Sequence, residues 1–261
     1  MSLQRRPFIA LAAGLLASSA AFADSALDAI MARKSISIAI PTDYPPYGFV
    51  GTDMTPQGLD IDMAKLVAAK LGVAVNLIPV ISANRIPYLQ THKADLVIST
   101  LGKNAEREKV IDFTSAYSPY FQAVFAARSL VIKSPADLAG KTIGATRGAI
   151  EDIELTKIAP QGADIKRFED NNATVSAFVS GQVQVIATGA SVAGNMMARN
   201  PQLGTEYKLL LKDSPNFIGV AKGDDKLRQK VNEIIVAAKA SGEIDRLCTK
   251  WLGRPAGDLP N

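Results

Sequence analysis

The fold class is decided by residues 59–80, which read LDIDMAKLVAAKLGVAVNLIPV. The first part of this stretch spaces its apolar residues as one face of a helix does: Leu59, Met63, Leu66, Val67 and Leu71. Gly72 then suits the end of that helix, because glycine readily adopts the left-handed conformation found after a last turn. Residues 73–80 alternate as a strand does. We therefore predict a helix followed at once by a strand.

The segments on either side extend this pattern. Residues 35–40 (SISIAI) are a strand candidate, and residues 94–100 (ADLVIST) are another. A short helix is predicted over residues 84–93 (NRIPYLQTHK). This alternation of strands and helices predicts an α/β protein with a mostly parallel sheet covered by helices.

A second α/β set follows an extended stretch with no helical period, residues 115–128 (SAYSPYFQAVFAAR). We therefore expect two lobes, each a β-sheet flanked by helices. Residues 24–123 and 216–261 are assigned to lobe 1, and residues 124–215 to lobe 2. A ligand would bind in the cleft between them, where the carboxyl ends of strands and the N-termini of helices converge.

Residues 1–23 have the pattern of a secretory signal peptide. Two arginines give a positive start, an apolar run follows, and residues 21–23 (AFA) form a small-x-small cleavage site. The apolar run is about 15 residues long, short of the roughly 20 that span a bilayer, which disfavours a membrane anchor. We predict cleavage before Asp24 and a periplasmic mature chain.

The composition excludes several functions. The chain has 261 residues, 48% of them hydrophobic and 21% charged, and a formal net charge of +4. Residues 1–23 hold two of its arginines and no acid, so the remainder carries +2. These positive charges are scattered, which argues against a nucleic-acid partner. Cys248 is the only cysteine and His92 the only histidine, so we expect no disulfide within the chain, no metal and no cofactor.

Catalytic groups are few. No Ser/His/Asp arrangement can form, and the acids worth naming are Glu151 and Asp152, beside a glycine-rich turn. Acids at a helix start commonly complement the helix dipole. An enzyme is therefore not expected.

Two loops after predicted strands carry residues suited to a ligand. Tyr44 belongs to a turn stiffened by two prolines and can cover the apolar body of a ligand. Thr100 and Gly102 follow the strand that ends near residue 98, and Arg107 lies five residues on. A guanidinium above hydroxyl and free N–H groups makes a cradle for a carboxylate.

Two further loops give weaker signals. The turn over residues 144–152 (GATRGAIED) leads into a helix, and the free N–H groups of Ala149 and Ile150 could hold an anion. Ser82 could cap the helix predicted after it. Arg85 would then lie at a helix start, where positive charge is unfavourable by roughly 0.3–1 kcal/mol, which suggests another purpose for it.

Together these features resemble the bacterial extracellular solute-binding proteins of the polar-amino-acid type, which serve ABC importers. The resemblance rests on four stretches in order: YPPYGF (44–49), GLDIDMAKLVAAKLG (58–72), LVISTLGKNAEREKVIDFTSAY (96–117) and SGEIDRLCTKWLG (241–253). It covers nearly the whole mature chain. It implies two lobes on a two-strand hinge that close over one small ligand, and a permease at the inner membrane as partner. We expect a monomer.

The resemblance implies roles in the first lobe. Thr100, Gly102 and Arg107 match positions that hold the ligand's α-carboxylate. Tyr44 matches an aromatic residue that covers the ligand. Ser82 and Arg85 match a Ser-x-Asn-Arg motif of aspartate- and glutamate-binding members, in which the Ser and Arg hold the side-chain carboxylate.

The second lobe departs from the family pattern. Gly148, Ala149 and Ile150 match a loop that usually reads Gly-Thr-Thr or Gly-Ser-Thr, so only backbone N–H groups can contribute here. An aspartate that binds the α-ammonium is common where Gly189 stands in QVIATGAS (184–191).

Asn171 matches another position near the ammonium, but it is uncharged. A buried ammonium without an anionic partner is unfavourable. Either the amine of an acidic amino acid finds another partner, or the ligand is a dicarboxylate or keto acid that has no ammonium.

The preferred hypothesis is therefore a periplasmic binding protein that delivers a small anionic solute, an acidic amino acid first, to an ABC permease. A binding protein for a dicarboxylate or keto acid is the nearest alternative. A cyclohexadienyl-dehydratase-like enzyme on the same scaffold would take its acid from Glu151 or Asp152. A sensory ligand-binding module is a further possibility.

Overall fold

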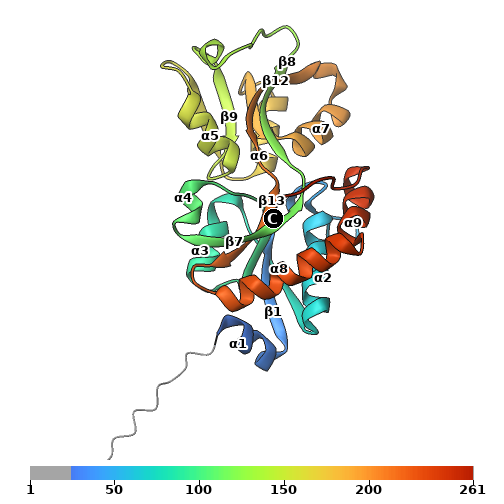
Figure 1. Ribbon diagram of the computed structural model, residues 1–261. Coiled ribbons are helices and arrows are strands. Elements are labelled where there is room, and N and C mark those ends of the chain that lie inside the picture. The colour runs from blue at the N-terminus through green and yellow to red at the C-terminus, as the bar shows by residue number, and fades with distance from the viewer. Residues whose placement is uncertain (1–24, 261) are drawn as a thin grey trace, which may run out of the picture.

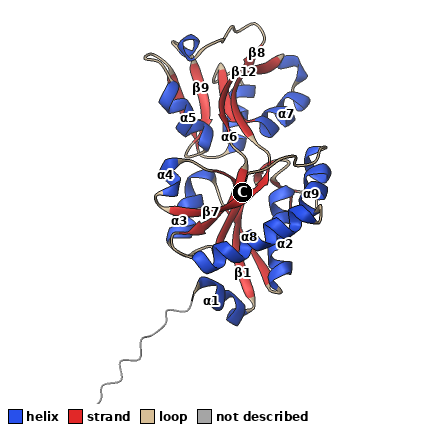
Figure 2. Cartoon of the chain, viewed as in Figure 1, coloured by secondary structure: helices blue, strands red, loops and turns tan. Residues whose placement is uncertain are grey.

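The computed structural model describes residues 25–260 and has two lobes, one above the other in Figure 1. The predicted signal peptide, residues 1–23, lies outside the described residues. Each lobe contains a five-stranded sheet with helices packed against it, as Figure 2 shows. The two-lobed α/β fold predicted from the sequence is confirmed.

The helices are α1 (Ala26–Arg33), α2 (Leu59–Leu71), α3 (Arg85–Gln90), α4 (Ala105–Glu108), α5 (Ile150–Ile158), α6 (Asn171–Val179), α7 (Ala190–Arg199), α8 (Asp225–Ala240) and α9 (Glu243–Leu252). The strands are β1 (Ser35–Ile40), β2 (Asp43–Tyr44), β3 (Gly48–Val50), β4 (Pro56–Gln57), β5 (Ala74–Pro79), β6 (Leu96–Gly102), β7 (Ile111–Ser118), β8 (Phe121–Ala127), β9 (Thr142–Thr146), β10 (Asp164–Phe168), β11 (Val185–Gly189), β12 (Thr205–Asp213) and β13 (Asn216–Ala221). Short 3-10 turns are η1 (Ser82–Asn84), η2 (Pro135–Leu138) and η3 (Pro201–Leu203).

Helix α2 forms as its apolar spacing predicts. Leu59, Met63 and Val67 are buried on one face, against the first sheet and the C-terminal helices. Burying a side chain of this kind stabilises the fold by about 1.5–3 kcal/mol. Gly72 ends the helix at φ 70°, and its N–H donates to the carbonyls of Ala68 and Ala69. Strand β5 then follows at once, as expected.

Both sheets are mixed rather than mostly parallel. The first has the order β5-β1-β6-β13-β7, with β5, β1 and β6 parallel and β13 antiparallel to both of its neighbours. The second has the order β10-β9-β11-β8-β12, with β8 antiparallel to both of its neighbours. The reason is that β8 and β13 are the strands by which the chain enters each lobe from the other, so they run against the βαβ units. A small sheet of β2, β3 and β4 was not predicted.

The chain crosses between the lobes twice. It leaves the first sheet at Ser118 and enters the second at Phe121, three residues before the expected boundary at residue 124. It returns between Asp213 and Asn216. The two crossings lie side by side, because the N–H of Ser214 donates to the carbonyl of Tyr120 at 3.2 Å.

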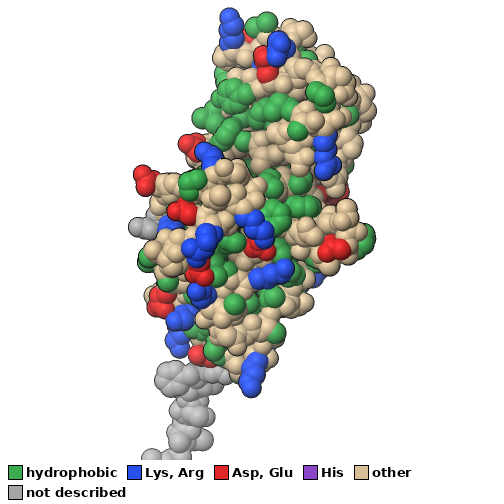
Figure 3. Space-filling model, turned by 90° about the vertical axis from the view of Figure 1, so that its right-hand side faces the viewer, with side chains coloured by type: hydrophobic (Ala, Val, Ile, Leu, Met, Phe, Trp, Pro, Cys, Tyr) green, Lys and Arg blue, Asp and Glu red, His purple; other side chains and the backbone are tan. Residues whose placement is uncertain are grey.

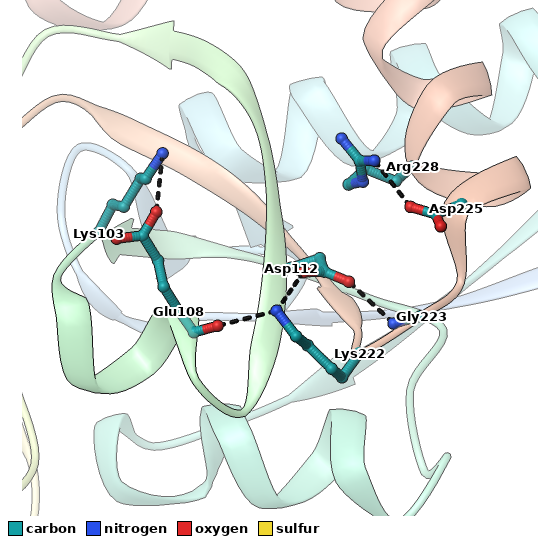
Figure 4. Close-up of polar contacts among 7 residues, drawn as sticks. All are labelled: Lys103, Glu108, Asp112, Lys222, Gly223, Asp225 and Arg228. Carbon is teal, nitrogen blue, oxygen red and sulfur yellow. Dashed lines mark hydrogen bonds and ion pairs between the residues drawn. The ribbon is translucent and has the colours of Figure 1, made fainter.

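The second crossing leads into β13 and α8, which complete the first lobe. At their junction Lys222 donates to the carbonyl of Glu108 at 2.9 Å and to the carboxylate of Asp112 at 2.7 Å, as Figure 4 shows. The N–H of Gly223 donates to the same carboxylate at 2.8 Å. Such exposed ion pairs contribute only about 0–1 kcal/mol each. The six buried residues of β13 therefore contribute more than these ion pairs to holding β13 and α8 in the first lobe.

Within residues 25–260, no helix combines the length and apolar character that a membrane crossing requires. The same residues bring no three or more His, Cys, Asp or Glu side chains together as a metal site would. Basic and acidic side chains are interspersed over the first lobe on the face shown in Figure 3.

Candidate ligand-binding site

The loops that the sequence placed in the cleft meet where the two lobes touch. In the first lobe they follow β1 and β5 and take in the end of β6, which runs on to Gly102 rather than ending near residue 98. In the second lobe they follow β9 and β10 and take in the end of β11 at Gly189. A Cβ built on Gly148 of the second lobe would come within 3.1 Å of Ala83 Cα in the first. A Cβ on Gly102 would come within 3.4 Å of Ile150. The lobes are therefore closed on one another at these loops.

Two buried arginines from the first lobe lie at this contact. Arg85 and Arg107 are each 4% exposed. The Nε of Arg85 donates to Ser99 Oγ at 3.1 Å. Arg107 donates from Nη1 to the carbonyl of Gly102 at 2.7 Å, and from Nη2 to the carbonyl of Gly148 across the interface at 3.0 Å. A guanidinium has five N–H donors, so both groups keep donors for a further partner.

The two guanidinium groups feel each other's charge. Burial, and then the nearby Arg85, lower the pKa of Arg107 to about 10. Arg107 therefore remains a cation at neutral pH. Two buried cations close together favour the arrival of anions.

Buried polar atoms without a partner gather at the same place. Ser82 Oγ, Thr100 Oγ1 and Glu151 Oε1 form no hydrogen bond within residues 25–260. The predicted capping role of Ser82 is wrong, because Asn84 occupies the N-cap of α3 and no side chain bonds there. An unsatisfied buried polar group is unfavourable by about 1–3 kcal/mol. These atoms are thus available to a polar ligand.

Thr100 is held in an unusual backbone conformation. Its φ is 43°, in a region that β-branched residues rarely enter. Its N–H donates to Asp60 Oδ2 at 2.7 Å, and Tyr117 donates to Asp60 Oδ1 at 2.7 Å. Asp60 is fully buried at the start of α2, and burial raises its pKa to about 7. Strain of this kind clusters at functional sites.

The two acids after the glycine-rich turn have different roles. Asp152 accepts a hydrogen bond from the N–H of Gly148 at 3.1 Å and pairs with Arg167 at 2.8 Å, as an acid near a helix start commonly does. Glu151 instead is 2% exposed, and the charges of Arg85 and Arg107 of the first lobe act on it. Burial raises its pKa to about 7, against the opposing effect of Arg85 and Arg107.

A pair of tyrosines takes the space beside Gly189. Tyr44 from the first lobe bonds through its hydroxyl to the hydroxyl of Tyr120, in the first crossing. A Cβ built on Gly189 would overlap both hydroxyl oxygens. The Tyr120 ring also meets Tyr47 edge to face, with ring centroids 5.2 Å apart. The position of the expected aspartate is therefore closed by phenol groups rather than left open.

Asn171 joins the lobes instead of presenting a free amide. Its backbone N–H and its Nδ2 donate to Asp43 Oδ2 of the first lobe, at 2.8 and 2.9 Å. Its Oδ1 accepts from Thr146 at 2.9 Å. The expectation that Asn171 accepts from a ligand ammonium is thus not matched by its present contacts.

The turn over residues 144–152 offers fewer free N–H groups to an anion than predicted, because the N–H of Ala149 donates to the Thr146 carbonyl.

Two clefts flank these residues. One, of about 400 Å³, runs beside the first crossing and is lined by Tyr47, Tyr120 and Trp251, among others. The other, of about 310 Å³, lies between Asp43 and the helices α6 and α7. Tyr44, Tyr120 and Gly189 form a wall at the lobe contact, and neither Arg85 nor Arg107 lines either cleft.

Sequence reasoning did not assign roles to Asp43, Asp60 and Tyr120. The sequence does hold a sign of the role of Asp60, because an acid on the apolar face of α2, beside Met63, is unusual. Tyr120 lies in an extended stretch with no periodicity, and nothing there distinguishes it from its neighbours.

Comparison with known proteins gives the family. A model of bacterial extracellular solute-binding proteins, family 3, matches residues 36–254. ABC transporter arginine-binding protein 1 of Escherichia coli (strain K12) is 28% identical over 228 residues, covering 84% of this chain and 91% of that protein. Other relatives are named for cystine, glutamine and histidine.

Solved structures agree with the family match. An ancestral arginine-binding protein bound to arginine has a TM-score of 0.80 at 32% identity, covering 85% of this chain and 99% of that one. An ancestral amino acid-binding protein, described as a precursor of cyclohexadienyl dehydratase, has a TM-score of 0.76 at 30% identity, covering 87% of this chain and 99% of that one. The chain belongs to the bacterial extracellular solute-binding proteins, family 3.

Proposed function

We propose that the protein is the periplasmic component of an ABC importer and captures an acidic amino acid by closing its two lobes. The carrying observation is the buried pair Arg85 and Arg107, next to hydroxyl oxygens that find no partner among residues 25–260. A ligand with two carboxylates supplies an anion to each guanidinium. A charged hydrogen bond contributes about 1.5–3 kcal/mol, so the pair favours diacids over neutral solutes.

The relatives named for arginine and histidine raise the question of a cationic ligand. A cationic side chain in this site would lie near the charges of Arg85 and Arg107. Like charges repel strongly when they are buried, because little water screens them. This argument favours an anionic side chain here even though the relatives are named for several kinds of amino acid.

Closure follows from contacts to both lobes. Arg107 already bonds the carbonyl of Gly148 across the interface, and Asp43 bonds Asn171. A solute held by Thr100 and Arg107 in the first lobe gains second-lobe contacts only when the lobes close. Binding therefore shifts the population toward the closed state, the form we expect a permease at the inner membrane to receive.

A thermal-shift screen of acidic amino acids, neutral amino acids, dicarboxylates and keto acids tests this function. A solute that binds only the folded protein raises its unfolding temperature. Calorimetric titration of Arg85→Ala and Arg107→Ala should follow, with exposed Arg246→Ala on α9 as the control. We expect Arg107→Ala to weaken every ligand by about 10- to 150-fold, and Arg85→Ala to weaken diacids alone.

The acidic preference fails if a neutral amino acid binds more tightly than L-glutamate and equally well to wild type and Arg85→Ala. Solute binding as such fails if no member of the screen shifts the unfolding temperature.

A second candidate function is favoured by Glu151 and by one structural neighbour. A buried carboxyl with a pKa near 7, beside two arginines, has the properties of a general acid for a dicarboxylate substrate. The neighbour is described as a precursor of cyclohexadienyl dehydratase. Incubation with prephenate or arogenate tests this activity, and the absence of turnover with both would remove it.

A further inference from the structure

We propose that Glu151 receives the ammonium group of the ligand, in place of the acid that position 189 lacks. This inference rests on the proposed function and deepens it, because it separates amino acids from dicarboxylates and keto acids. It assigns to the second lobe a residue outside the Gly148–Ile150 loop expected to contact the ligand.

The first step is the state of the Glu151 carboxyl. It lies in the first turn of α5, is 2% exposed, and its Oε1 has no hydrogen-bond partner within residues 25–260. Over the same residues it takes part in no ion pair, whereas its neighbour Asp152 pairs with Arg167. A buried carboxyl that is left unpaired in this way is a strong acceptor for a donor from outside the chain.

The second step is elimination among the acids at the interface. Asp43 is engaged by the N–H and Nδ2 of Asn171. Asp60 is engaged by Thr100 and Tyr117, one on each oxygen. Asp152 is engaged by Gly148 and Arg167. Among these four acids, Glu151 alone keeps a buried oxygen with no partner in the part of the chain that the structure describes.

The third step is what an ammonium requires. It offers three donors and no acceptor, so it cannot use the guanidinium groups, which are also donors only. The hydroxyl oxygens of Tyr44 and Tyr120 can each accept one hydrogen bond, but they carry no charge at neutral pH, because burial raises the pKa of both well above its usual value. Glu151 supplies the negative charge.

The charges around Glu151 fit a ligand with both signs. The titratable and charged groups that act on it are Arg85, Arg107, Asp152, Tyr44 and Tyr120. Two cations for carboxylates and one carboxyl for an amine match the charge pattern of an acidic amino acid. A dicarboxylate would meet the arginines equally well but would leave Glu151 without a partner.

The arrival of an ammonium has a measurable consequence in protons. Burial raises the pKa of Glu151 to about 7, so near that pH part of the population holds the proton. A cation beside the carboxyl favours its ionised form. An amine-bearing ligand should therefore release protons on binding near pH 7, and an analogue without the amine should not.

The test uses matched pairs in which only the amine differs: L-glutamate and glutarate, L-glutamine and glutaramate, L-arginine and 5-guanidinopentanoate. Wild type, Glu151→Gln and the control Glu154→Gln, one turn along α5, are titrated calorimetrically at pH 7 in two buffers of different ionisation enthalpy. Unfolding curves establish that each variant is folded.

We expect Glu151→Gln to weaken the amino acid of the binding pair at least tenfold, to change its deamino partner less than threefold, and to abolish proton release. Glu154→Gln should behave as wild type. Equal weakening of both members of a pair, an unchanged Glu151→Gln, or a wild type that prefers the deamino member overturns the proposal.

The same titrations test the preference for acidic amino acids separately from the role of Glu151. The preference fails if the glutamine or arginine pair binds and the glutamate pair does not, and the role of Glu151 is still decided by the pair that binds. Binding of none of the six compounds overturns both.

Discussion

Replacing Gly189 by alanine places a methyl group where the hydroxyl oxygens of Tyr44 and Tyr120 lie. Gly189 ends β11 in the second lobe, whereas Tyr44 ends β2 in the first. The overlap with Tyr44 therefore arises only when the lobes approach each other, and the overlap with Tyr120 comes from the crossing segment. We expect Gly189→Ala to oppose closure and to weaken solute binding while each lobe keeps its own core.

The magnitude follows from the packing. Inserting a methyl group into a filled site typically costs about 1–3 kcal/mol, which corresponds to about a 5- to 150-fold loss of affinity. Alanine substitutions at two other glycines, where the added methyl group has more space, serve as comparisons. A Cβ on Gly102 meets Ile150 at 3.4 Å, an ordinary contact, so Gly102→Ala should weaken affinity less than threefold. A Cβ on Gly194 meets nothing within 4 Å, so Gly194→Ala should leave affinity unchanged.

The assay is calorimetric titration with L-glutamate, or with the solute that most stabilises the wild type in the screen. Small-angle scattering of the saturated proteins reports closure as a smaller radius of gyration. Gly194→Ala should also unfold at a higher temperature, because alanine is favoured over glycine within a helix by about 1 kcal/mol. The reasoning about the tyrosine pair is refuted if Gly189→Ala binds and closes as Gly194→Ala does.

Two further predictions concern acids at the interface. Asp43→Ala removes the acceptor of two hydrogen bonds from Asn171 across the lobes, so solute dissociation in stopped-flow measurements should become about tenfold faster or more, and an unchanged rate would contradict this. Burial raises the pKa of Asp60 to about 7, so the folded state keeps a proton that the unfolded state loses from roughly pH 4 upward. This group should therefore lower the free energy of unfolding as pH rises from 4 to 7, by up to about 4 kcal/mol, and urea titrations of Asp60→Asn should show a weaker pH dependence over that range.

Local patterns predicted the elements and the loops of the site. Helix α2 and strand β6 follow from apolar spacing within a few residues. Gly148 lies beside Ala83 and Gly102 beside Ile150, so loops from both lobes meet at the lobe contact. Arg85 stood out because a positive charge at a helix start is unfavourable. The structure buries it and leaves most of its donors without a partner in residues 25–260.

Features that depend on distant residues could not be predicted. Asp43 and Asn171 are 128 residues apart in the chain, and no local pattern relates them. The free N–H expected at Ala149 is used by Thr146, because the turn closes on itself before the helix begins. The absent side chain at Gly189 was visible in the sequence, but its reason lies in Tyr120, which reaches it from the crossing segment.

The choice between Glu151 and Asp152 shows the same limit at shorter range. The two acids are adjacent, so their side chains point in directions about 100° apart around α5. Asp152 meets Arg167 and the turn, and Glu151 lies within reach of the charges of Arg85 and Arg107. The sequence identifies the pair but not which member lies near the two arginines, since that depends on how the helix is docked.

Tyr120 belongs both to the crossing between the lobes and to the wall at the lobe contact. It lies in the segment on which the lobes turn, and its hydroxyl also forms part of the wall beside Gly189. A rotation of one lobe about the crossing segment would therefore also move the wall at Tyr120. A bulky solute and a slender one would bring the lobes to rest at different angles. In the proposed function a permease would contact the outside of the lobes, and this angle is what it would sense of the solute. The rate of import would then depend on the angle between the lobes that each solute allows. The solute that binds most tightly need not be the one transported fastest.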